Sequence, residues 1–245
     1  HGLSVDIDPI MKIARENNLI VIEDSAQTVL GKYKGRMAGT LADIGVFSFE
    51  AKKHMTSGSE GGMIVTDDES LAIRARKFAG LGYKHMNANA GRTSLALSTA
   101  QNPNYERFDT VGLNYRMNEV SAAVGLAQLE RIDHIVERRK VCGALFLDAI
   151  NGCDFLVPQK TPNCCENSYY DFTIKYLGEE KLGLTWKDFY NRYIEMGGDG
   201  FYGACIIPYL EPAFSDLEVN GVTYERGICP IAENLHDKNF LMLEL

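Results

Sequence analysis

The chain has 245 residues, of which 45% are hydrophobic and 24% charged, and its formal net charge is −8. This balance is typical of a globular protein and excludes a disordered tail or a collagen-like rod. The acidic charge argues against a nucleic-acid partner, because a nucleic-acid-binding face is basic. No apolar run approaches the ~18 residues that a membrane-spanning helix needs, so no membrane partner is expected either.

The cysteines indicate a reducing compartment and no metal centre. None forms a C-x-x-C pair, and no histidine lies near them at the spacing of a zinc site. No basic and apolar leader is visible, so free thiols in the cytoplasm are expected. We also expect both ends to be cut from a longer protein, since the chain opens at His1 without a starting methionine and stops at Leu245 inside an apolar pattern. The six cysteines are Cys142, Cys153, Cys164, Cys165, Cys205 and Cys229.

The first predicted elements are a helix and a buried strand. Asp8-Pro9 is typical of a helix start, with an N-cap oxygen followed by a ring that fits the first turn. Asn17-Asn18 marks the end of that helix. The apolar run 19–22 predicts a strand that is buried on both faces of a parallel sheet and ends at Glu23-Asp24.

The next predicted elements complete an α/β domain. Strands are predicted over 44–49 and 62–66, and a helix from about 69 to 79 whose acidic first turn complements the helix dipole. Residues 80–113 show no period and predict a long loop. A single apolar stripe predicts one long helix from about 118 to 150.

A smaller unit follows. Gly152 and the proline-bounded stretch 158–162 are typical of a boundary, after which a strand over 169–176 and a helix over 186–196 are predicted, with the rest irregular. The prediction is therefore an α/β domain over 1–150 and a small α+β domain over 151–245.

Two charged residues each follow a predicted strand, namely Asp24 and Lys53. In an open parallel sheet, ligands bind beyond the carboxyl ends of the strands, so the two side chains are candidates for one crevice. From these residues alone, a capping aspartate and a solvated loop lysine remain the commoner interpretation.

Several longer motifs change that balance. The segments 23–27 and 47–62 resemble the nucleotide-sugar aminotransferases of the DegT/StrS family, which are pyridoxal-phosphate (PLP) enzymes with the aspartate-aminotransferase fold. His1-Gly2-Leu3, the 111–119 segment around Asn114-Tyr115-Arg116-Met117, Glu137-Arg138-Arg139 and Cys229-Pro230-Ile231-Ala232-Glu233 resemble further segments of that family, in the same order. The resemblance thus covers nearly the whole chain and is most specific from Glu23 to Gly62.

The resemblance implies a fold type I large domain with a mainly parallel sheet, N-terminally incomplete, and a small, truncated C-terminal domain. It also implies amination of a keto group on a nucleotide-linked sugar, with glutamate as the expected donor. The position matching Lys53 carries the lysine that forms a Schiff base with PLP and then moves the substrate proton. Lys52 competes by adjacency, although the spacing from Phe47 favours Lys53.

The family pattern also assigns roles to the other site residues. Asp24 would face the pyridine nitrogen and keep it protonated, Gln27 would contact the ring hydroxyl, and Ser48 would donate to the phosphate. For Gln27 the alternative is an exposed amide at a helix start. For Ser48 it is a strand serine bonded to neighbouring backbone.

Asn114 and Arg116 match a loop that reaches the partner subunit's site in this family. Asn114 would bind the cofactor phosphate there and Arg116 a substrate phosphate or carboxylate, which makes the expected unit a homodimer with composite sites. A surface ion pair is the alternative for Arg116. His54 is expected to pack or orient rather than catalyse. Tyr115, Tyr202 and Tyr209 are candidates for a sugar pocket, with packing as the default.

Two departures from the family pattern leave alternatives open. Ser59 looks like a one-residue insertion between the lysine and Glu60-Gly61-Gly62. An N-terminal stretch that supplies a phosphate cradle and a stacking aromatic ring in the family is absent from this sequence. A sister branch performs 3-dehydration and carries His in place of the lysine, so a PLP-dependent dehydratase is one alternative. An inactive truncated relative with a regulatory or interaction role is the other.

Overall fold

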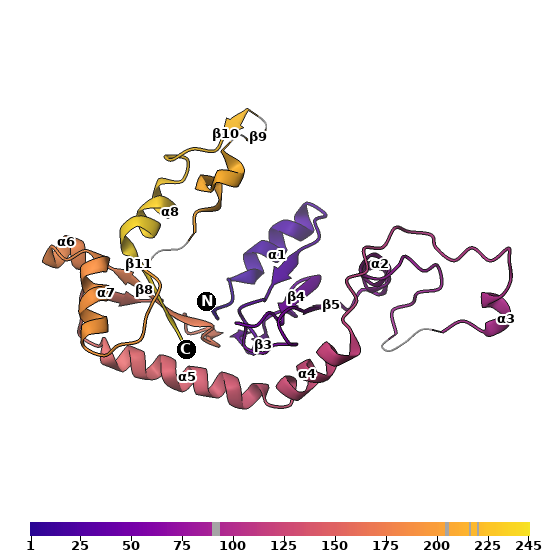
Figure 1. The fold of residues 1–245 in the computed structure, drawn as a ribbon, viewed down its shortest axis with the longest axis horizontal. Helices are drawn as coiled ribbons and strands as arrows, with labels where there is room; N and C mark the ends of the chain where they lie inside the picture. Colours follow the sequence, from indigo (N-terminus) through magenta and orange to yellow (C-terminus); the bar gives the residue numbers. More distant parts are fainter. Residues whose placement is uncertain (90–93, 204–205, 216, 220) are drawn as a thin grey trace. The chain divides into compact units, whose positions relative to one another are not determined.

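The computed structural model describes residues 1–89, 94–203, 206–215, 217–219 and 221–245 (Figure 1). The chain divides into two compact units. The N-terminal unit comprises Gly2–Glu137 and Asn163–Ser168, and the C-terminal unit comprises His1, Arg138–Pro162 and Tyr169–Leu245. The two compact units divide between Glu137 and Arg138, within one helix. The predicted domain boundary at residue 150 stays a prediction.

In the N-terminal unit the elements are α1 (Ile7–Glu16), β1 (Ile22–Asp24), β2 (Lys32–Tyr33), β3 (Arg36–Met37), β4 (Ile44–Ser48), β5 (Gly62–Val65), α2 (Glu69–Ala79), α3 (Leu97–Ala100), α4 (Glu119–Leu129) and β7 (Cys165–Glu166). Helix α5 (Ile132–Ala149) begins there and continues into the C-terminal unit. That unit contains β6 (Leu156–Pro158), β8 (Asp171–Tyr176), α6 (Gly178–Leu182), α7 (Trp186–Glu195), the 3₁₀ helices η1 (Pro208–Leu210) and η2 (Pro212–Phe214), β9 (Glu218–Val219), β10 (Val222–Thr223), α8 (Pro230–Asn234), the π-helix η3 (Leu235–Asn239) and β11 (Phe240–Glu244). No described helix is long and apolar enough to cross a bilayer.

The sheet of the N-terminal unit has the strand order β1-β4-β5. Strands β1 and β4 run parallel, whereas β4 and β5 are antiparallel, so the described sheet is mixed rather than mainly parallel. The expected burial of 19–22 on both faces is wrong. Leu19, Ile20 and Ile22 are each about 60% exposed, because β1 starts only at Ile22 and alternates an inward Glu23 with outward neighbours.

The start of α1 differs from the prediction. Asp6, not Asp8, is the N-cap residue, and it makes no side-chain cap hydrogen bond. The Asp8 carboxylate instead accepts hydrogen bonds from Lys34 at 2.7 Å and Arg36 at 3.1 Å. A long-range ion-pair partner has thus replaced the local cap. The end at Asn17 and the start of α2, where Asp68 accepts from the Leu71 amide at 2.8 Å, are as predicted.

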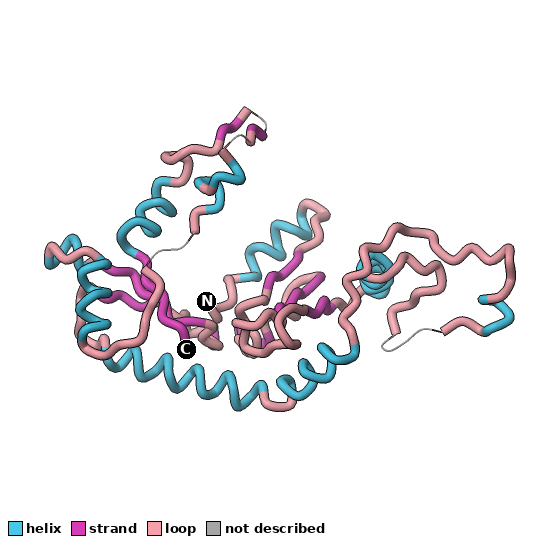
Figure 2. The backbone as a smooth tube through the Cα atoms, in the orientation of Figure 1, coloured by secondary structure: helices cyan, strands magenta, loops and turns pink. Residues whose placement is uncertain are grey.

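The single long helix predicted from 118 to 150 is two helices (Figure 2). Asn118 caps α4, and a short break at Glu130-Arg131 separates it from α5. The break lets Ile132 and Val136 pack with Val29 and Met55 in a buried cluster. A prediction from apolar residues at constant helical spacing does not detect a short break of this kind, because the spacing continues across it. The predicted loop 80–113 contains one helical turn, α3, and its residues 90–93 lie outside the described residues.

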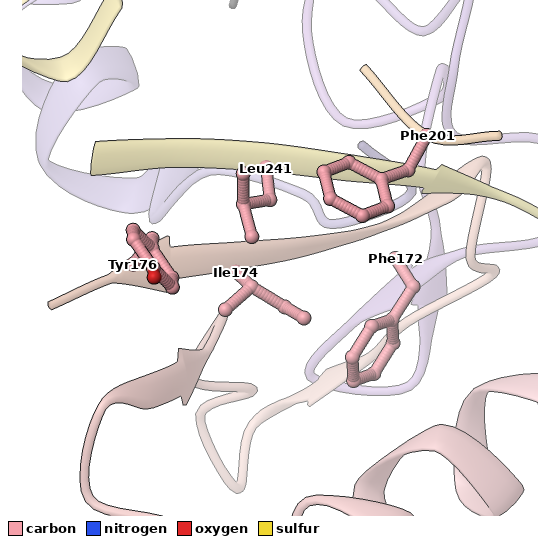
Figure 3. Close-up of a cluster of buried hydrophobic side chains, with 5 residues drawn as sticks. All are labelled: Phe172, Ile174, Tyr176, Phe201 and Leu241. Carbon is pink, nitrogen blue, oxygen red and sulfur yellow. The ribbon is translucent and has the colours of Figure 1, made fainter. Parts of the chain in front are cut away.

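The C-terminal unit is built on an antiparallel sheet with the order β11-β8-β6. Phe172, Ile174 and Tyr176 alternate along β8 and lie with Leu241 of β11 and Phe201 in one buried cluster (Figure 3). Aromatic residues of α7, such as Phe189 and Tyr193, cover this cluster. The expectation that the chain is irregular after residue 196 is wrong at β11, whose continuous apolar run lacks the alternation typical of a strand.

Leu241 is fully buried against Ile174, its partner across the β11–β8 ladder. We expect Leu241→Ala to lower the free energy of unfolding by about 3 kcal/mol, because the lost side chain leaves a cavity. Trp186 is the sole tryptophan and packs against the same cluster, so its fluorescence during urea unfolding reports the change. Leu182→Ala, at a residue 52% exposed in the same unit, is the control and should have little effect; equal losses would contradict the assigned core.

His1 and the buried Asp171 form an ion pair at 2.8 Å. The hydrogen bond with Asp171 raises the pKa of His1, against the opposing effect of partial burial. A raised pKa means that the pair stabilises the fold fully below the unfolded pKa of ~6.5, and that this contribution is lost as pH rises through the folded pKa. We expect the unfolding free energy to fall as the pH rises from about 6.5 through the raised pKa of His1, and His1→Gln to flatten that part of the profile. A slope unchanged in His1→Gln would refute the assignment.

Candidate functional site

The candidate site lies at the carboxyl ends of β1 and β4. Asp24 pairs with Val46 in the parallel ladder, and Ser48 lies two residues beyond Val46 on the same strand. Paired residues, and residues two apart, share one face of a sheet, so Asp24 and Ser48 lie on the same face. Strand spacing and rise put their Cα atoms roughly 8 Å apart. The opposite face carries Glu23 and Phe47, which point into the packed side of the sheet.

Backbone groups orient the two polar side chains. One oxygen of the Asp24 carboxylate accepts from the Ala26 amide at 3.0 Å, which fixes its direction and leaves the other oxygen without a partner among the described residues. Ser48 Oγ accepts from the Glu50 amide at 3.3 Å, so its hydrogen is still available to donate. Gln27 follows Asp24 in a turn, not at a helix start, and is half-buried.

The two neighbouring lysines differ in exposure. The segment after β4 forms a turn in which the Lys53 amide donates to the Glu50 carbonyl at 3.0 Å. Lys53 is half-buried, whereas Lys52 is exposed and its amide donates to the Glu50 carboxylate. Lys53 is thus the less exposed of the two lysines in this turn.

Ser59, the expected insertion, adopts a strained conformation in the loop that follows. Its φ is 117°, a region that L-residues rarely adopt, and its carbonyl accepts from the Ala51 amide at 2.8 Å. The insertion therefore bonds directly to the turn that carries Lys53. Gly61 allows close packing next to it, because an added Cβ would clash with Ser57 Oγ and lie 3.1 Å from Met117.

A buried contact outside the family motif holds the residue after the lysine. His54 is 2% exposed, and its Nε2 lies 3.1 Å from the Ser168 carbonyl, 114 residues along the chain. Ser168 is fully buried, and its amide donates to the Gly2 carbonyl at 2.8 Å. No local pattern marks Ser168, so the sequence alone missed it. His54 is thus seated as an orienting residue would be.

We expect His54→Leu to lower the free energy of unfolding by about 2 kcal/mol, because the Ser168 carbonyl would lose its buried donor. His54→Asn, which keeps a donor, should recover part of the loss. Urea unfolding of the three proteins measures both effects. If leucine and asparagine are equally damaging, loss of ring packing rather than loss of the hydrogen bond is responsible.

Asn114 and Arg116 are brought together, since Arg116 Nε donates to Asn114 Oδ1 at 2.8 Å. Asn114 has a left-handed φ of 57°, and its amide donates to the Gly80 carbonyl at 2.9 Å. Within the described chain Arg116 makes no ion pair, unlike the surface pair considered as its alternative. Both side chains are exposed, and Met117 on the same segment lies beside Gly61 of the loop after Lys53.

The three tyrosines expected near a sugar pocket differ in exposure and in their contacts. Tyr115 is 69% exposed and meets Phe78 edge-on, and Tyr202 is 44% exposed. Tyr209 donates to the buried Glu233 at 2.6 Å. Burial and the Glu233 carboxylate raise the pKa of Tyr209 to about 12, while that hydrogen bond lowers the pKa of Glu233. Tyr209 therefore has a structural partner within the C-terminal unit.

The donor set of the N-terminal unit is compatible with a phosphorylated pyridine cofactor. A carboxylate and a hydroxyl on one sheet face, with a half-buried amine in the turn after β4, match the charge pattern of a phosphorylated pyridine aldehyde. An α/β fold with this donor set is typical of the PLP-dependent transferase class. The sequence matches the model of the DegT/DnrJ/EryC1/StrS aminotransferase family over residues 1–235, and the chain belongs to that family.

Individual relatives agree with this assignment. The GDP-perosamine synthase of Caulobacter vibrioides is 42% identical over 145 residues, which cover 58% of this chain and 34% of that protein. The solved aminotransferase of Psychrobacter cryohalolentis superposes with a TM-score of 0.79 at 27% identity, covering 97% of this chain and 60% of the other. The Escherichia coli GDP-4-keto-6-deoxy-D-mannose-3-dehydratase, solved with hydrated PLP, gives a TM-score of 0.76 at 24% identity and covers 99% and 60%.

These comparisons place the chain in the fold type I class. The match spans about a third of the length of the curated relative and about 60% of the solved ones.

Proposed function

We propose that the protein is a PLP-dependent aminotransferase that converts a keto group on a nucleotide-linked sugar to an amine. The observation that carries the proposal is the half-buried Lys53, which lies in the turn after β4 in a chain of this aminotransferase family. Lys53 would hold the cofactor covalently and, once released by the amino donor, move a proton at the substrate carbon.

When bound, PLP supplies an electron sink for the carbon that loses a proton. The residues of the chain supply the rest. Asp24, its carboxylate oriented by the Ala26 amide, would hold a proton on the pyridine nitrogen. Gln27 would contact the ring hydroxyl, and Ser48 would donate its remaining hydrogen to the phosphate.

We propose a homodimer in which Asn114 and Arg116 complete the partner subunit's site, with Asn114 on the cofactor phosphate and Arg116 on a substrate anion. Support comes from the exposed apolar side chains of this segment, since Val111 is 80% and Val120 77% exposed. Apolar side chains that gather on one exposed segment are typical of an interface. Light scattering of the purified protein tests the proposal, and a monomer at every concentration would refute it.

The substrate class follows from the relatives named GDP-perosamine synthase, which support a nucleotide-linked sugar. Glutamate is the proposed amino donor. The five described cysteines are free thiols, as suits the reducing cytoplasm that we propose as the compartment.

Borohydride reduction followed by peptide mass spectrometry tests the assignment. The polypeptide that the gene encodes should carry one reduced cofactor on Lys53. A cofactor trapped on Lys52 would move the site by one residue. If no residue is labelled and no PLP is bound, the inactive-relative alternative holds.

The dehydratase alternative would bind PLP without a covalent lysine link, so borohydride would trap nothing on the chain. His54, the residue next to Lys53, is buried and its Nε2 bonds to the Ser168 carbonyl, which does not suit a residue that acts on substrate. This contact favours transamination over dehydration.

A further inference from the structure

The adjacent cysteines Cys164 and Cys165 lie at the start of β7, outside the candidate site. Their sulfur atoms are 3.8 Å apart. Cys164 is exposed, and Cys165 is partly buried against the cluster formed by Ile7, Tyr33 and Leu41. The two thiols therefore form a contacting pair that is open to solvent on one side.

The backbone holds this pair in place. The Lys34 amide donates to the Cys164 carbonyl at 2.6 Å, and Cys165 pairs with Tyr33 in the antiparallel ladder of β2 and β7. A preorganised pair of donors loses little freedom when it binds a ligand. Burial, and then the hydrogen bond with the neighbouring Cys164, raise the pKa of the Cys165 thiol.

The geometry suits chelation better than a disulfide. Consecutive Cα atoms are ~3.8 Å apart, below the usual 4.4–6.8 Å of a disulfide. No group of three His, Cys, Asp or Glu able to hold a metal occurs among the described residues, so a tetrahedral zinc site is not built here. Two thiolates alone are the donor set of soft centres with low coordination numbers.

We propose that Cys164 and Cys165 form a chelating dithiol site for a soft, thiophilic centre, either monovalent copper or trivalent arsenic. Copper binding forms two S–Cu bonds and releases both thiol protons to solvent. With phenylarsine oxide, two As–S bonds form while the arsenic–oxygen bond and two S–H bonds break. The oxygen leaves as water with both protons, and no atom is oxidised or reduced.

Phenylarsine oxide titration of the reduced whole polypeptide, followed by intact-mass and peptide mass spectrometry, tests the site. We expect one arsenical per chain, bridging Cys164 and Cys165, which excess dithiol removes and excess monothiol does not. Cys164→Ser should weaken capture about a hundred-fold, because the second bond of a chelate forms intramolecularly. Cys229→Ser, which removes an exposed lone cysteine, is the matched control and should capture normally.

Two results would overturn the proposal. One is an arsenical adduct that maps to cysteines other than Cys164 and Cys165. The same conclusion would follow if the Cys164→Ser variant still formed an adduct that excess monothiol does not remove. The other is an arsenical that binds with a stoichiometry of zero at the pair, whereas failure of prior loading with monovalent copper to block the arsenical would overturn the copper half of the proposal alone. Because Cys164 is exposed, the serine variant should fold, and circular dichroism checks this independently of any transaminase activity.

Discussion

Lys53→Ala is expected to abolish the yellow absorbance band of the purified protein and to lower kcat at least about a thousand-fold, equivalent to ~4 kcal/mol in the barrier. The reason is that the proposed mechanism uses this amine twice, as the covalent anchor of the cofactor and as the group that moves the proton. Visible absorbance and single-turnover kinetics with keto sugar and glutamate measure the two roles separately.

Lys52→Ala is the matched control. Lys52 is the adjacent exposed lysine of the same turn, so its removal should leave both the band and kcat near wild type. A band that persists in Lys53→Ala and disappears in Lys52→Ala would transfer the role to Lys52. Normal turnover in Lys53→Ala would end the aminotransferase proposal.

Asp24→Asn is expected to keep the cofactor but lower kcat by a factor of about a hundred to a thousand, ~3–4 kcal/mol. The amide has the shape of the carboxylate and can still accept from the Ala26 amide, but it lacks the charge that would keep the ring nitrogen protonated. The effect should therefore fall on the chemical step, with a smaller change in PLP affinity.

Asp67→Asn is the control for Asp24→Asn. Asp67 is an exposed carboxylate that precedes α2, so its neutralisation should leave kcat unchanged. The dissociation constant of PLP and the rate of the first half-reaction distinguish the outcomes. Loss of PLP binding with an unchanged rate in the remaining holoenzyme would assign Asp24 to cofactor affinity rather than to chemistry.

The sequence predicted the strands that carry the candidate residues. Asp24 ends β1 and Ser48 ends β4, and the parallel pairing of the two strands places both residues on one face of the sheet. The shared crevice of Asp24 and Lys53 stays a prediction. The motif spacing placed Lys53 in the turn after β4. The ends of the strands and the position of the turn could be predicted because each depends on a short run of neighbouring residues.

Features that depend on distant partners could not be predicted. Asp8 bonds to Lys34 and Arg36 rather than capping its own helix, and the Glu130-Arg131 break follows from packing of Ile132 on Met55. The exposure of Ile20 likewise depends on which other segments pack against β1, and the hydropathy of the isoleucine side chain does not determine it. The contact between His54 and Ser168 joins residues 114 positions apart, and no periodicity reports it.

The return of residues 163–168 to the N-terminal unit has a consequence for biosynthesis. The ribosome makes the lysine-bearing turn long before it makes Ser168, so a nascent chain holds His54 without its carbonyl partner while more than a hundred further residues are added. The N-terminal unit therefore cannot complete its folding strictly in the order of translation. The contact between His54 and Ser168 forms only after the residues beyond α5 have left the ribosomal exit tunnel.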